Sequence, residues 1–169
     1  MRKTGTTIAA AALLATMLGG CGGKSAEDRM AEAAASAMLG TKVSVDDDGE
    51  TVTFGDGDKA MTIASGDAAK LPDGFPDDVF LPDDYKVDST IASGDFTMVT
   101  LRAPGEVGEL ADAAKARMES SGWKQQMMAG DDSSRIYAFR HEQQIASLSF
   151  DRHDDGGVLY TVQLSNAPN

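Results

Sequence analysis

The sequence is poor in the residues on which several protein classes depend. It holds one cysteine, two histidines and one tryptophan in 169 residues, and its 15 basic side chains face 27 acidic ones, for a net charge of −12. A single cysteine excludes a framework of disulfide bridges. The shortage of Lys and Arg excludes binding along duplex nucleic acid, because phosphate contacts depend on clustered positive charge. The remaining composition, 41% hydrophobic with 18 glycines, is that of an ordinary globular chain.

Residues 1–20 have the pattern of an export signal. Arg2 and Lys3 are followed by an apolar run over 8–18 that is too short to span a bilayer. Small residues then lead to the sole cysteine; the four residues are Leu18, Gly19, Gly20 and Cys21. This ending resembles the lipobox of bacterial lipoproteins. The resemblance implies cleavage before Cys21, with diacylglycerol on its sulfur and a further acyl chain such as palmitate on its amine.

The expected attachment to the membrane is covalent. Two or three acyl chains hold a protein durably, since each buried methylene contributes about 0.8 kcal/mol. Loss of residues 1–20 leaves 13 basic and 27 acidic side chains, a net charge of −14 (13 − 27) that anionic headgroups repel. A secretory signal with an incidental cysteine and an uncleaved anchor are the alternatives. Gly22 stands where some Gram-negative lipoproteins carry an inner-membrane Asp, so cell membrane and outer membrane both remain open, with the body facing the periplasm or the exterior.

Residues 21–40 predict a lipidated tether and an Ala-rich helix over 26–39 that ends at Gly40. The helix has one weak apolar stripe, made of Met30, Ala33, Ala34, Ala37 and Met38. A stripe of methyl groups and two methionines buries little area. We therefore expect a stalk or a loosely docked helix, with a partner-binding helix as the alternative.

Residues 41–66 predict a small acidic β-meander. Apolar and polar residues alternate in three short segments, around 43–45, 52–54 and 61–63, and acidic turns at 46–50 and 55–58 separate them. Clustered carboxylates are also what Ca²⁺ requires. The spacing lacks the EF-hand order, and hairpin turns favour Asp and Gly on backbone grounds alone. Turn chemistry is the favoured interpretation, and a weak divalent-cation site is the alternative.

Residues 67–86 form a Pro-rich connector with Pro72, Pro76 and Pro82. Proline removes backbone donors and restricts the residue before it, so an extended segment is expected instead of a helix. The connector is too apolar for a free linker because it also carries Phe75, Val79, Phe80, Leu81 and Tyr85. We expect it to lie along the body and to fill a groove at the edge of the sheet.

Residues 87–169 predict an α+β domain. Alternation and turn signals indicate strands over 87–92, 96–102, 123–128, 135–141, 144–151 and 158–165. A helix is expected over 106–120, ended by Gly122, with its apolar stripe at Val107, Leu110, Ala111, Ala114 and Met118. The predicted fold is one main helix packed on an antiparallel sheet of about six strands, preceded by the short helix and the acidic meander.

The order of these segments resembles an uncharacterised family of bacterial exported lipoproteins. The motifs that carry the resemblance are Phe75-Pro76-Asp77-Asp78-Val79 with the following Pro82, and Gly122-Trp123 directly after the helix. The resemblance implies an α+β unit in the cell envelope and implies no activity. This chain departs from the pattern in the middle of the helix, where Ala114 and Lys115 replace an aromatic residue.

Candidates for chemistry are few. His141 and His153 lie next to charged turns, no Gly-x-Ser-x-Gly elbow is present, and no His or Cys pair has metal-ligand spacing. No catalytic residue, metal or cofactor is therefore predicted. Trp123, Phe75, Phe80 and Tyr85 either line a ligand groove or fill the core. We expect a non-catalytic envelope lipoprotein that meets a protein partner through a strand edge or the connector; an envelope-polymer hydrolase using His153 or paired acids and a divalent-cation binder are the alternatives.

Overall fold

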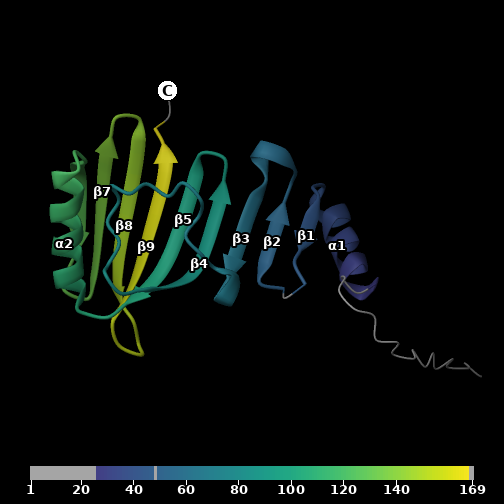
Figure 1. The fold of residues 1–169 in the computed structure, drawn as a ribbon, viewed down its shortest axis with the longest axis horizontal. Helices are drawn as coiled ribbons and strands as arrows, with labels where there is room; N and C mark the ends of the chain where they lie inside the picture. Colours follow the sequence, from purple (N-terminus) through teal and green to yellow (C-terminus); the bar gives the residue numbers. More distant parts are fainter. Residues whose placement is uncertain (1–25, 48, 168–169) are drawn as a thin grey trace, which may run out of the picture.

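The computed structural model describes residues 26–47 and 49–167, so the predicted signal, Leu18, Gly19, Gly20 and Cys21 lie outside the described residues. The strands form a single antiparallel sheet in the order β1-β2-β3-β4-β5-β9-β8-β7-β6; α1 lies beside β1, and α2 packs on the face of β6, β7 and β8 (Figure 1). The elements are α1 (Ala26–Leu39), β1 (Val43–Val45), β2 (Thr51–Phe54), η1 (Gly57–Lys59), β3 (Met61–Ser65), η2 (Gly66–Ala68), β4 (Lys86–Ser93), β5 (Phe96–Ala103), α2 (Val107–Ser120), β6 (Lys124–Gly130), β7 (Ser134–His141), β8 (Gln144–Arg152) and β9 (Val158–Asn166).

The α+β class is confirmed, but the expected size of the sheet is wrong. The sheet has nine strands instead of about six, because the acidic meander continues it. Strand β3 pairs with β4 in register, with Ile63 opposite Ile91 and Ala64 opposite Thr90. Pairing of this kind supplies the backbone groups of β4 with partners that an edge strand would lack. The predicted meander and the predicted α+β unit therefore share one hydrogen-bonded sheet.

The main core lies on one face of β5, β9, β8 and β7, beneath α2 and the connector. Helix α2 buries the stripe that its sequence predicted, with Val107, Ala111, Ala114 and Met118 all at most 1% exposed. The small Ala111 and Ala114 stand where an aromatic would keep the helix farther from the sheet. The sheet side of the core consists of alternate residues, namely Val99, Leu101, Ala103, Tyr137, Phe139, Ala146, Leu148, Phe150, Val158, Tyr160 and Val162.

The sheet carries apolar residues on one face at the α2 end and on the other face at the α1 end. In β1 to β5 the paired residues that share the face opposite the main core form a continuous apolar row, Val45, Val52, Ile63, Ile91 and Met98. Met98 precedes the core residue Val99, and neighbouring residues in a strand point to opposite faces. The alternation in the meander is therefore real, but its apolar side does not extend the core beneath α2.

The connector crosses the core face of the sheet beside α2, where the teal chain in Figure 1 passes in front of the central strands. This placement corrects the expectation that it fills a groove at the edge of the sheet. Val79, at the middle of the connector, is 3% exposed and belongs to the main core. Helix α2 leaves the core face above β9 uncovered, and the apolar connector residues occupy that space.

Helix α1 packs against the free edge of β1 with its polar side. The Ser36 hydroxyl accepts a hydrogen bond from the Val43 N–H at 2.8 Å, and the Glu32 carboxylate accepts one from the Val45 N–H at 2.6 Å. Met30 and Met38 are 69% and 88% exposed. The helix is therefore present as predicted, and its apolar stripe faces away from the sheet.

Candidate functional site

Two hydrogen bonds hold the turn of the connector against the end of α2. The Trp123 Nε1–H donates to the Asp78 carboxylate at 2.9 Å, and the Arg117 guanidinium donates to the Asp77 carbonyl oxygen at 3.1 Å. Trp123 is itself 2% exposed, and its backbone N–H donates to the Met118 carbonyl oxygen at 3.0 Å. The Gly-Trp motif after the helix therefore ends α2 and binds the connector.

A third contact holds the part of the connector that follows this turn. The Tyr160 hydroxyl donates to the Phe80 carbonyl oxygen at 3.0 Å, and the two rings pack with centroids 5.9 Å apart. Tyr160 is fully buried and also stacks on Phe150 at 4.4 Å between ring centroids. Burial raises the pKa of the Tyr160 phenol well above its ordinary value of 10.0, because the charged phenolate loses its hydration.

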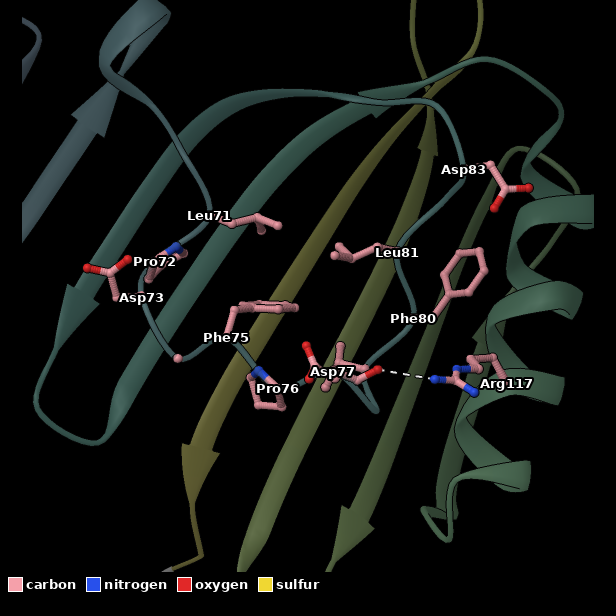
Figure 2. Close-up of a pocket in the computed structure, with 12 residues that line it drawn as sticks. Leu71, Pro72, Asp73, Phe75, Pro76, Asp77, Phe80, Leu81, Asp83 and Arg117 are labelled. Atoms are coloured by element: carbon pink, nitrogen blue, oxygen red, sulfur yellow. Dashed lines mark hydrogen bonds between the residues drawn. The ribbon is translucent and has the colours of Figure 1, made fainter.

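The parts of the connector before and after its turn, here called its two limbs, border a hollow of about 600 Å³. Figure 2 shows Leu71 and Leu81 pointing toward one another from opposite limbs, with Phe75 below them and Arg117 reaching in from α2. The lining is Leu71, Pro72, Asp73, Gly74, Phe75, Pro76, Asp77, Val79, Phe80, Leu81, Asp83 and Arg117. The hollow therefore combines apolar walls with charged groups, which is the composition of small-ligand and peptide sites.

The charge around the hollow is mainly negative. Three of the lining residues are acidic, Asp73, Asp77 and Asp83, and all three are exposed at its rim. None of the three makes an ion pair with any residue that the structure describes, and Arg117 is the one cation among the lining residues. A ligand with an apolar part and a positive charge matches this lining.

The four aromatics for which core filling was favoured over a ligand groove all pack in or against the main core. Phe75 and Phe80 line the hollow, whereas Trp123 is buried behind the connector and Tyr85 packs against the main core. The sequence reasoning missed Arg117 and Tyr160. Arg117 lies on the polar side of α2, one residue before the buried Met118, and nothing in the sequence pairs it with the connector. The signal for Tyr160 was its position among the inward-facing residues of β9.

The histidines lie apart from one another in the described structure. His141 Nδ1 is 3.5 Å from Asp78 Oδ2, and its ring lies 5.4 Å from the Trp123 ring between centroids. His153 accepts a hydrogen bond from the Asp155 N–H at 3.2 Å, within the turn between β8 and β9. His141 thus belongs to the anchor of the connector, and His153 to a turn.

The acidic loops of the meander use their described carboxylates locally. The Thr51 N–H donates to Asp46 at 3.0 Å, and this backbone hydrogen bond lowers the pKa of Asp46 from its ordinary value. Asp56 pairs with Lys42 at 2.8 Å, and Asp48 lies outside the described residues. Among residues 26–47 and 49–167, no three His, Cys, Asp or Glu side chains gather as a metal site requires.

Replacing Tyr160 by phenylalanine is expected to lower the free energy of unfolding by about 1–2 kcal/mol at neutral pH, because a buried carbonyl loses its donor. The phenol pKa is raised in the folded state, so the contribution of the hydroxyl persists below about pH 10 and falls at higher pH, where the unfolded chain ionises first. Urea unfolding at pH 7 and above pH 10 measures both effects. Tyr160→Phe should lose less stability than the parent between these pH values; equal losses would contradict the assigned burial.

Comparison with protein families, with curated proteins and with solved structures finds no match to this chain. The resemblance to exported lipoproteins accordingly stays a prediction from the motifs quoted above. No helix in the described part of the chain is both long and apolar enough to cross a membrane.

Proposed function

We propose that this chain is an exported bacterial lipoprotein, held to the cell membrane or the outer membrane by acyl chains on Cys21, whose body binds a partner without catalysing a reaction. The signal pattern over 1–20 and the Leu18-Gly19-Gly20-Cys21 ending support the anchor. The predicted net charge of −14 for the processed chain makes electrostatic adhesion to anionic lipid unfavourable, so covalent chains carry the attachment.

The observation that carries the binding function is the hollow inside the connector. Its walls are apolar side chains that would otherwise fill a core, and they are held open by contacts behind them, from Trp123 to Asp78 and from Tyr160 to Phe80. Because these contacts fix the limbs before a ligand arrives, little conformational entropy is lost on binding. The hollow suits an extended segment of an envelope protein that presents an apolar side chain next to Lys or Arg.

Photocrosslinking in intact cells tests this site. A photoreactive phenylalanine analogue at position 75 is expected to form adducts with a defined envelope protein. The matched control is the same analogue at position 54, since Phe54 is a half-buried phenylalanine on the opposite face of the sheet from the core. Reversal of Asp73 and Asp77 to lysine should reduce the adduct at position 75. Identical adducts at both positions, or none at position 75, would contradict binding in the hollow.

A further inference from the structure

The two edges of the nine-stranded sheet differ in how they are protected. At β1, the side chains of Ser36 and Glu32 on α1 bind the outward N–H groups of the strand. At β6 all seven residues are exposed, and the edge lies at the opposite end of the sheet order. An open edge presents unpaired N–H and C=O groups that pair readily with another strand. The β6 edge is therefore the part of the described sheet that can accept one.

The hairpin geometry shows which groups of β6 point outward. The Asp131 N–H donates to the Ser134 carbonyl oxygen at 2.7 Å, and hydrogen-bonded pairs alternate along an antiparallel ladder from that point. The backbone N–H and C=O groups of Met128 and Gly130 consequently face away from β7. Met127 and Met128 are 51% and 55% exposed and lie on opposite faces of the strand. A strand added here would gain backbone hydrogen bonds and an apolar contact on each face.

A bulge restricts the open part of this edge. The register of β6 against β7 shifts between Gln125 and Met127, and the Gln126 side chain donates to the Lys124 carbonyl oxygen at 3.2 Å. The start of the strand is thereby partly closed by its own side chain. Pairing is confined to a short segment centred on Met128, so the contact is specific in register and modest in strength.

We propose that β6 pairs antiparallel with β6 of a second copy of this chain, centred on Met128. The charges at the edge favour this occupant. Lys124 makes no ion pair with any residue in the described ranges, and Arg140 is its neighbour in β7. Asp132, in the turn that follows the strand, is fully exposed and forms an ion pair with Arg135 at 3.4 Å. Antiparallel pairing brings Lys124 of each copy to the end of the partner strand where Asp131 and Asp132 lie, so that unlike charges meet at both ends.

The pairing closes at two copies. A two-fold contact uses the same strand of each copy, and α1 covers the remaining β1 edge of both, so the sheet cannot grow further through that edge. Confinement to one membrane raises the effective concentration of a weak pair. This last contribution rests on the proposed lipid anchor, whereas the strand geometry and the charge pattern do not.

Cysteine crosslinking of the full-length chain in membranes tests the pairing. Paired Cα atoms at Met128 would lie about 5.5 Å apart, within the range that a disulfide bridges. Met128→Cys should give a reducible dimer on mild oxidation, whereas Lys59→Cys, an exposed site in the turn between β2 and β3, should stay monomeric. Equal crosslinking of both variants, or none in either, would overturn the proposal. A reducible dimer of the parent chain would instead reveal a free Cys21 thiol and contradict the anchor alone.

Charge reversal separates this geometry from random collision. Adding Lys124→Glu to Met128→Cys should lower the crosslinked fraction roughly threefold, because glutamate then lies near the partner's acidic turn at 131–132. Adding Asp132→Lys as well should restore the fraction, since the unlike pairing is rebuilt in the opposite sense. Both changes lie on exposed side chains and leave the core intact. A crosslinked fraction that ignores Lys124→Glu, or that falls further with Asp132→Lys, would refute the antiparallel register.

Discussion

Replacing Trp123 by alanine is expected to lower the free energy of unfolding by about 3–5 kcal/mol. The indole is 2% exposed and packs where α2, the sheet and the connector meet. Its removal leaves a cavity and also deprives the Asp78 carboxylate of its Nε1–H donor. Part of the loss should therefore appear as opening of the connector.

Two control variants divide the Trp123 effect into its parts. Trp123→Phe keeps most of the apolar volume and removes the donor, and Asp78→Ala removes the acceptor while leaving the indole in place. Each is expected to cost about 1–3 kcal/mol, less than Trp123→Ala. Urea unfolding followed by circular dichroism gives the free energies, and hydrogen exchange over 71–83 reports on the connector. A Trp123→Ala protein as stable as the parent, with unchanged exchange, would contradict the anchoring role.

Gly130→Ala is expected to destabilise the protein by about 3 kcal/mol or more, through strain and overpacking together. Gly130 has φ +109°, and a Cβ there would lie 2.0 Å from the Ser134 carbonyl oxygen and 2.9 Å from the Arg135 Cα. Both neighbours are backbone atoms of the adjoining strand, so neither can move without breaking the β6–β7 hairpin.

Gly156→Ala is the matched control for Gly130→Ala. Gly156 has φ +92°, but a Cβ there has no neighbour within 4 Å, so the backbone penalty stands alone at about 1–2 kcal/mol. Thermal unfolding of the two variants should separate the cost of the backbone conformation from the cost of steric overlap between the added Cβ and β7. Equal midpoints would mean that the close approach of β7 contributes nothing and would contradict the described hairpin.

Local signals in the sequence predicted most helices and strands. The wrong predictions concern how these helices and strands pack against one another. Alternation and turn signals together predicted the strands from β1 to β9, and the stripe from Val107 to Met118 predicted the buried side of α2. These patterns depend on neighbours in sequence. The joining of β3 to β4 depends on residues far apart in the chain, such as Ile63 and Ile91, and no local pattern distinguishes a separate meander from an extension of the same sheet.

At the candidate site too, local features were predicted from the sequence and tertiary contacts were not. Proline spacing predicted an extended connector, and its apolar residues predicted contact with the body. The hollow arises from the bend between Leu71 and Leu81 and from the approach of Arg117, which are tertiary properties. The weak apolar stripe of α1 gave no prediction of its packing side, and the helix turns Ser36 and Glu32 toward β1 because hydrogen bonds to that edge outweigh the burial of a few methyl groups.

The measurement that tests the central proposal most directly is the intact mass of the protein extracted from membranes, with a fragment spectrum of its amino-terminal peptide. The proposal requires a chain that starts at Cys21 and carries diacylglycerol on sulfur and an acyl chain on the amine. Cys21→Ser should leave residues 1–20 attached or release the chain from the membrane fraction. A chain that starts at Met1, or one that starts at another residue with an unmodified Cys21, would contradict the anchor and with it the placement of the binding body at a membrane.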